Sequence, residues 1–100
     1  MTQDAAGSVL LEHAVGLHAR PSVKFTQLAK TFRSRIEFAV SVDGPWIDAK
    51  SIVKVMGMKA KQDSTLYMRA RGGDATAAVE ALRGLVERDF DEDRADAASG

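Results

Sequence analysis

The sequence contains no cysteine among its 100 residues. It therefore cannot form a disulfide, hold a metal through thiolates or use a thiol as a nucleophile, a composition that suits a reducing cytoplasm. No apolar run approaches the roughly 18 residues that a membrane-spanning helix needs, and residues 1–7 lack the basic and apolar regions of a signal peptide. We therefore expect a cytoplasmic protein that makes no membrane contact.

The chain also lacks an excess of charge of either sign, since 14 basic side chains balance 14 acidic ones. The distribution is uneven, however. Residues 87–100 hold six carboxylates and two guanidiniums, a net charge of −4, which leaves +4 on residues 1–86. That positive charge is too sparse for the Lys and Arg stripe of a nucleic-acid binder, so we expect no nucleic-acid partner. It suits the attraction of acidic proteins.

The length and the 45% hydrophobic content suffice for a single domain with one core. Residues 1–7 are small and polar, and residues 91–100 are acidic with Ala, Ser and Gly. Both compositions are typical of tails without fixed structure. We therefore predict one domain over residues 8–90, flanked by two disordered tails, and expect it to act as a monomer.

Alternation of apolar and polar residues predicts strands over residues 8–13, 35–40 and 64–71, and around Trp46 and Ile47. Helical spacing predicts helices over residues 19–32, 50–58 and 75–86, the last with Asp74 as its N-cap. Asp43-Gly44 predicts the turn of a hairpin between the two middle strands. The order βαββαβα indicates an α+β open-faced sandwich, a four-stranded antiparallel sheet with three helices on one face.

The segment from residue 16 to residue 22 joins the first predicted strand to the first helix and is the candidate site. His18 falls at or next to the helix N-cap, and Pro21 is tolerated in a first turn whose amides lack helical partners. Those amides and the helix dipole favour an anion, and the Arg20 guanidinium suits phosphate oxygens. Neutral imidazole is a nucleophile, so His18 can accept and pass on a phosphoryl group without a metal or a cofactor.

Residues 16–22 resemble the active-site signature of HPr, the histidine-containing phosphocarrier of the bacterial phosphoenolpyruvate-dependent phosphotransferase system. Residues 48–56 are similar to the family's second signature, around a regulatory serine at the start of the short helix. The similarity extends from about residue 9 to residue 86, and the family has the predicted element order. It implies that His18 is phosphorylated through Nδ1, that Arg20 is the phosphate partner and that Ser51 is a regulatory phosphosite.

The resemblance also implies the partners of the protein, which would be a phosphoryl carrier rather than an independent enzyme. Enzyme I would supply the phosphoryl group, a histidine of an enzyme IIA-type domain would receive it, and a serine kinase/phosphorylase would act on Ser51. The relay would serve sugar uptake or a regulatory, nitrogen-related branch. The implied binding residues come from the active-site turn, the first helix and the short helix: Gly16, Ala19, Pro21, Ser22, Lys24, Val53, Lys54 and Met56.

A second hypothesis is a non-catalytic α+β module that binds a ligand or regulates a partner, with His18 only as a helix cap. Acid-labile, base-stable phosphate on His18 would separate the two hypotheses. His13 lies in the predicted first strand among apolar neighbours and is assigned a structural role, and no carboxylate set completes a metal site with the two histidines. The chain departs from the family pattern at Lys59 and Asp63, where the family usually has Gly.

Overall fold

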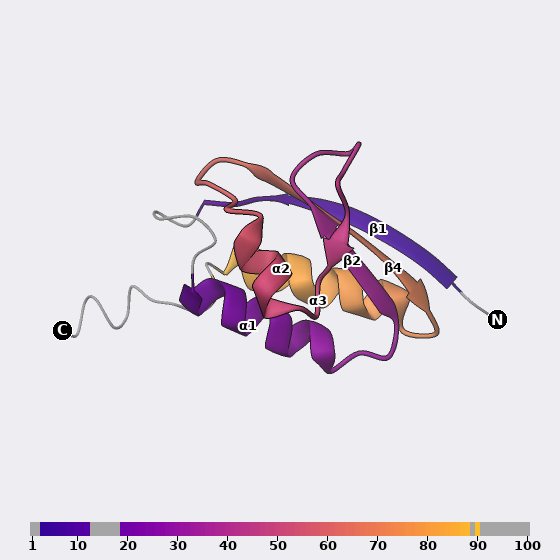
Figure 1. The fold of residues 1–100 in the computed structure, drawn as a ribbon. Coiled ribbons are helices and arrows are strands. Elements are labelled where there is room, and N and C mark those ends of the chain that lie inside the picture. The colour runs from indigo at the N-terminus through magenta and orange to yellow at the C-terminus, as the bar shows by residue number, and fades with distance from the viewer. Residues whose placement is uncertain (1–2, 13–18, 89, 91–100) are drawn as a thin grey trace.

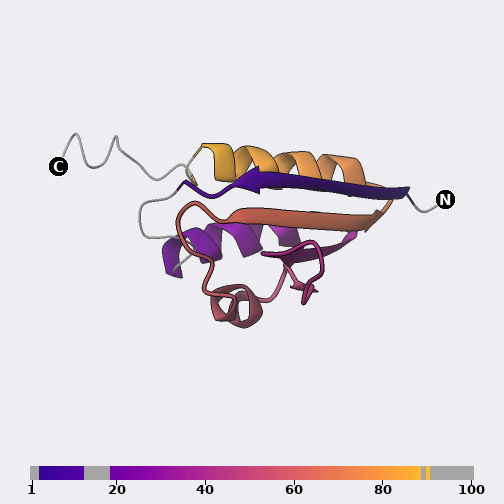
Figure 2. The same ribbon diagram turned by 90° about the horizontal axis from the view of Figure 1, so that it is seen from above.

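The computed structural model describes residues 3–12, 19–88 and 90 (Figure 1). Its elements are β1 (Gln3–Leu10), α1 (Ala19–Lys30), β2 (Arg35–Ala39), β3 (Ile47–Asp48), α2 (Ile52–Gly57), β4 (Thr65–Gly72) and α3 (Ala75–Glu87). The four strands form one antiparallel sheet in the order β1-β4-β2-β3. The helices lie on one face of it, with α2 toward β3 (Figure 2), so the predicted architecture is confirmed.

The core lies between the sheet and the helices. Alternate residues of each central strand point inward, and the apolar stripes of α1 and α3 meet them. The Phe25 ring of α1 lies 5.3 Å from that of Phe38 in β2, between ring centroids. Of the four apolar residues that predicted α1, Phe25 and Ala29 are fully buried, whereas Leu28 and Phe32 are partly buried.

The first strand begins at Gln3 rather than at residue 8, so the prediction of a disordered tail is wrong for residues 3–7. Gln3 pairs with Gly72 and Gly7 pairs with Met68, because β4 is long enough to provide a partner along the whole segment. Gly7 also permits close packing of α3, since a Cβ there would lie 2.9 Å from the Val79 side chain. The described strand ends at Leu10, and His13 lies outside the described residues.

Asp74 is the N-cap of α3, as predicted, and its carbonyl oxygen accepts a hydrogen bond from the Ala78 amide at 2.9 Å, but its side chain makes no capping hydrogen bond. Its carboxylate instead accepts hydrogen bonds from the backbone amides of Arg33 and Ser34, both at 2.9 Å, and from the Ser34 hydroxyl. The Ser34 hydroxyl and then the Arg33 amide hold the pKa of Asp74 below its usual value. The carboxylate thus ties the start of α3 to the loop between α1 and β2.

The predicted hairpin is confirmed, since β2 and β3 pair through Glu37 with Asp48 and through Phe38 with Ile47. Its turn is closed by the Gly44 amide, which donates to the Ser41 carbonyl oxygen at 2.9 Å. Gly44 has a φ of 88°, a left-handed conformation that glycine adopts without steric cost. Among the described helices, none is long and apolar enough to cross a membrane.

Candidate functional site

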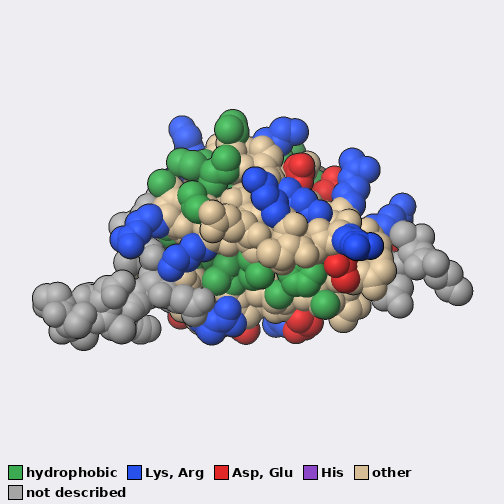
Figure 3. Space-filling model, turned by 90° about the horizontal axis from the view of Figure 1, so that it is seen from below, with side chains coloured by type: hydrophobic (Ala, Val, Ile, Leu, Met, Phe, Trp, Pro, Cys, Tyr) green, Lys and Arg blue, Asp and Glu red, His purple; other side chains and the backbone are tan. Residues whose placement is uncertain are grey.

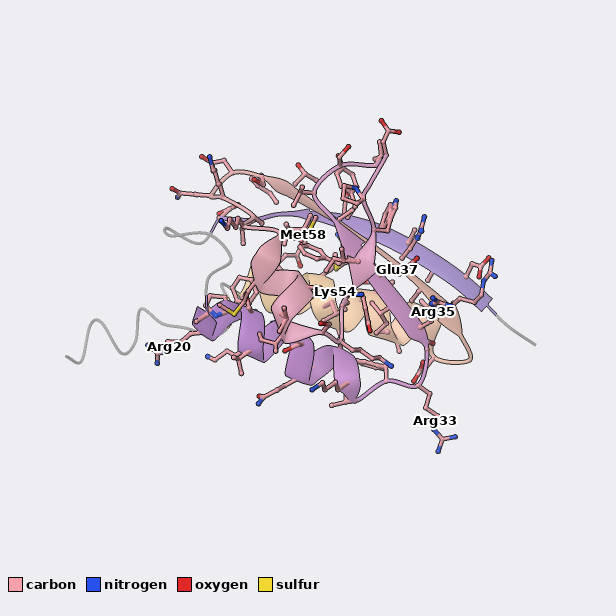
Figure 4. All side chains as sticks on the ribbon, in the orientation of Figure 1. Arg20, Arg33, Arg35, Glu37, Lys54 and Met58 are labelled. Atoms are coloured by element: carbon pink, nitrogen blue, oxygen red, sulfur yellow. The ribbon has the colours of Figure 1, made fainter. Side chains whose placement is uncertain are left out.

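The start of α1 holds the described part of the predicted phosphoryl site. His18 and Gly16 lie outside the described residues. Ala19 and Arg20 are exposed, and the Arg20 side chain extends outward from the end of the helix (Figure 4). The first turn contains no acidic residue, so nothing in it offsets the positive end of the helix dipole. The arrangement favours an anion beside Arg20.

Three other residues that the resemblance implied in binding are held within the fold. Pro21 and Ser22 are fully buried. Lys24, one turn further along α1, is half-buried, and its Nζ donates a hydrogen bond to the Phe90 carbonyl oxygen at 2.9 Å. No local pattern in the sequence marks this contact, because the two residues are 66 positions apart. These side chains position the start of α1 rather than extend from it.

Ser51 is the N-cap of α2. Its backbone is extended, with φ −104° and ψ 111°, and its Oγ accepts a hydrogen bond from the Lys54 amide at 3.3 Å. Its carbonyl oxygen accepts the first bond of the helix, from the Val55 amide at 2.9 Å. The hydroxyl satisfies an amide that would otherwise lack a helical partner. The Ser51 side chain therefore lies directly at the start of α2, partly exposed.

The short helix α2 presents apolar side chains to solvent. Val53 is 77% exposed and Met56 is 39% exposed, whereas Val55 between them is fully buried and anchors the helix. Because α2 packs beside α1, its exposed apolar side chains lie next to the helix that carries Val23, which is 40% exposed. Figure 3 shows hydrophobic side chains gathered on this side of the molecule. We call this surface the α1–α2 face and define it by Arg20, Val23, Val53 and Met56.

Lys54 lies apart from the two exposed apolar residues of α2. At 100° per residue it projects about 160° around the helix from Met56. It lines a cleft of about 710 Å³ between α2 and the β2–β3 hairpin, together with Arg35, Trp46 and Met58 (Figure 4). The resemblance implied Lys54 as a binding residue along with Val53 and Met56, and the structure places it toward this neighbouring cleft.

The loop after α2 contains both departures from the family pattern. Lys59 has a φ of 52° and Asp63 a φ of 71°, so each adopts the left-handed conformation that glycine adopts without cost. For residues with a side chain this conformation costs roughly 1–2 kcal/mol, less for Asp. Hydrogen bonds from the Lys59 amide to the Met56 carbonyl oxygen and from the Asp63 amide to that of Leu11 fix the loop at both positions.

The outer face of the sheet carries charges that pair with one another. Arg69 donates to Glu37 at 2.7 Å and lies over the Trp46 ring, 4.0 Å from its centroid. Arg71 donates to Asp4 at 2.9 Å, and this carboxylate raises the pKa of Arg71 above its usual value. Within the described ranges, no three His, Cys, Asp or Glu side chains form a cluster that could hold a metal.

Comparison with known proteins gives concordant results. Residues 6–88 match a protein-family model described as "PTS HPr component phosphorylation site". Phosphocarrier protein HPr of Cupriavidus necator is 42% identical over 78 residues, which cover 78% of this chain and 85% of that protein. Phosphocarrier protein NPr of Proteus mirabilis is 32% identical over 85 residues, 85% of this chain and 93% of that protein.

A similar solved structure is the crystal structure of HPr-C-His from Thermoanaerobacter tengcongensis. It superimposes with a TM-score of 0.81 at 32% sequence identity, covering 89% of this chain and 98% of that chain. The family match begins within β1 and includes all three helices and the other three strands. The similarity therefore spans the whole sandwich and both sequence motifs rather than one local segment.

Proposed function

Because this chain belongs to the HPr family of phosphocarriers of the phosphotransferase system, we propose that His18 accepts a phosphoryl group from phosphorylated enzyme I and passes it to a histidine of an enzyme IIA-type domain. Family membership supports the carrier role. The assignment to His18 depends mainly on one observation, that residue 18 directly precedes α1, whose first turn exposes Arg20 and holds no carboxylate.

The proposed transfer needs no further reactant. The phosphorus–nitrogen bond of the donor histidine breaks while one forms at Nδ1 of His18, and the second transfer repeats this exchange with the acceptor histidine. The amides at the start of α1 and the Arg20 guanidinium would stabilise charge on the transferring phosphoryl oxygens. Buried Pro21 and Ser22 would keep this first turn in place, and Gly16 and Ala19 would form the turn around the phosphoryl group.

We propose the α1–α2 face as the surface on which both partners dock. Val53 and Met56 would provide the apolar contact, and the cations of α1 together with Lys54 would attract an acidic partner. Lys24 would contribute its charge to the field without direct contact, since its ammonium group bonds to the Phe90 carbonyl oxygen. The protein would act as a cytoplasmic monomer, in sugar uptake or in a regulatory, nitrogen-related branch.

Ser51 is proposed as a regulatory phosphosite for a serine kinase/phosphorylase. A phosphoryl group there adds a charge of about −1.5 to −2 at the start of α2, where the amides of the first turn tolerate an anion. The same charge would lie next to the exposed Val53 and would oppose an acidic partner. Modification would therefore weaken docking without unfolding the helix.

The test is incubation with enzyme I and phosphoenolpyruvate, followed by intact-mass measurement. The wild-type protein should gain one acid-labile, base-stable phosphoryl group and pass it to a IIA-type domain. His18→Ala should abolish acceptance, whereas His13→Ala, the matched control, should retain it. Labelling of the folded His18→Ala protein would refute the assignment. A wild-type chain that accepts no phosphate would favour the non-catalytic module.

A further inference from the structure

The chain leaves the core at a defined place beside the start of α1. Phe90 follows α3, and its side chain is fully buried in the hydrophobic core. Its carbonyl oxygen accepts the hydrogen bond from Lys24 at 2.9 Å. Lys24 is one helical turn from Arg20, about 6 Å along the axis. The last described residue is therefore held next to the α1–α2 face, where the end of α3 and the start of α1 lie close together (Figure 1).

The two helices that form this face contain no carboxylate. The sequences of α1 and α2 include four cations, Arg20, Lys24, Lys30 and Lys54, and neither Asp nor Glu. Exposed apolar side chains lie beside these charges, and in Figure 3 hydrophobic and basic side chains adjoin one another on this side. Such a surface favours a segment that carries several negative charges.

The residues that follow Phe90 have the complementary charge. Residues 91–100 contain four carboxylates and one guanidinium, a net charge of −3. A ten-residue segment spans at most about 35 Å when extended and about 17 Å on average as a coil, so it can reach all of α1 and α2 from residue 90. Tethering at such a distance gives an effective concentration of the order of millimolar.

We propose that residues 91–100 occupy the α1–α2 face of their own chain and compete there with acidic partners. The contact would be electrostatic and would weaken as salt increases. Its consequence for phosphoryl transfer rests on the proposed function, whereas the contact itself does not. A partner would have to displace the acidic segment, so the segment would slow productive encounters with weakly bound acidic proteins in particular.

The contact can be tested by NMR on the full chain. The test variant neutralises the four tail carboxylates through Asp91→Asn, Glu92→Gln, Asp93→Asn and Asp96→Asn. At about 20 mM salt, signals of Val23, Val53 and Met56 should differ between this variant and the wild type, and the difference should vanish at about 500 mM, where charges are screened within a few ångströms. Identical signals at low salt would overturn the proposal.

Two further variants make the test specific. Arg94→Gln makes the segment more acidic and should shift the same signals in the opposite direction to neutralisation. Asp43→Asn combined with Glu80→Gln removes carboxylates from other surfaces and should leave the signals of Val23, Val53 and Met56 unchanged. Equal changes in this control would mean that net charge, rather than contact by residues 91–100, moves the signals.

Transfer from enzyme I provides the second readout. Neutralising the tail should raise kcat/KM about twofold to fivefold at low salt and leave it unchanged at high salt, because a competing charge has been removed from the docking surface. An NMR contact in a chain that enzyme I does not phosphorylate would refute the proposed function alone. Normal phosphorylation with no tail effect in either measurement would refute the tail proposal alone.

Discussion

The outer face of the sheet and the α1–α2 face differ in how their charged side chains are arranged. On the sheet, Arg69 and Arg71 are paired with Glu37 and Asp4, and Arg69 also covers Trp46. The helices α1 and α2 have cations without a carboxylate and expose apolar side chains beside them. A surface whose charges are paired internally offers little to a charged partner, whereas cations on helices that contain no carboxylate, next to apolar area, favour docking.

Because of this difference, we expect substitutions on the two surfaces to affect different properties, stability on the outer sheet face and phosphoryl transfer on the α1–α2 face. Exposed ion pairs contribute about 0–1 kcal/mol, so substitutions on the outer sheet face should have small effects on stability and none on transfer. Substitutions on the α1–α2 face remove few buried contacts and should change transfer while the fold persists. Comparing a variant of one surface with a variant of the other tests this separation.

Among substitutions on these two surfaces, the largest effect is expected for Arg20→Ala. Loss of a guanidinium that stabilises charge in transfer should lower the rate of phosphoryl transfer by about tenfold to a hundredfold, with little change in melting temperature because Arg20 is exposed. Arg69→Ala is the matched control on the sheet. It should leave transfer unchanged and lower stability by at most about 1 kcal/mol. Stopped-flow or rapid-quench measurements with enzyme I compare the transfer rates of the two variants. Equal rates would show that Arg20 takes no part in transfer.

A smaller loss of transfer is expected for Ser51→Asp. The carboxylate can still cap α2, so the melting temperature should stay close to that of the wild type. One negative charge next to Val53 should lower kcat/KM with enzyme I by about fivefold at low salt and less at moderate salt. Ser41→Asp adds the same charge in the turn between β2 and β3 and should have no effect. If Ser51→Asp matches the wild type at both salt concentrations, Ser51 is only a helix cap.

The sequence predicted those features whose signals are local. The order of elements follows from the period of apolar residues, and the cap at Ser51 follows from a hydroxyl before a short apolar run. The placement of Lys54 away from Met56 was also predictable, because it follows from helical geometry alone. Both sequence motifs could likewise be found without the structure, since each is a continuous segment.

The features that the sequence did not predict depend on partners far along the chain. Residues 3–7 form a strand because β4 is there to pair with them, more than 60 positions away. Asp74 satisfies every local rule for an N-cap, yet its carboxylate bonds to Ser34 across 40 positions. Phe90 lies beyond the last helix, where no periodic pattern marks it as buried. The structure at such positions is determined by tertiary contacts, which local sequence patterns do not reveal.

Asp74 lies outside both surfaces, and its contact with the loop between α1 and β2 predicts that the stability of the fold depends on pH. Because its folded pKa is below the usual value, the ionised carboxylate stabilises the fold above about pH 4, and this contribution is lost as the pH falls through the folded pKa. Asp74→Asn should therefore be less stable than the wild type at pH 6, with the difference narrowing toward pH 3. Urea unfolding at several pH values measures this. Asp43→Asn, in an exposed turn, is the control, and a constant difference across the range would contradict the assignment.

The smallest effect is expected in the loop that joins α2 to β4. Lys59→Gly relieves a left-handed backbone at φ 52° but increases the conformational freedom of the unfolded chain, so the net gain in stability should be about 0.5–1 kcal/mol. Asp63→Gly should gain less, because Asp adopts this conformation more readily.

Lys61→Gly is the matched control, since Lys61 is not among the residues with positive φ and its replacement brings only the entropic cost. Chemical denaturation compares the three variants. If Lys59→Gly and Lys61→Gly lose stability equally, residue 59 carries no backbone cost in solution. If only Lys61→Gly loses stability, residue 59 has a left-handed backbone in solution, a conformation that glycine adopts at lower cost than lysine.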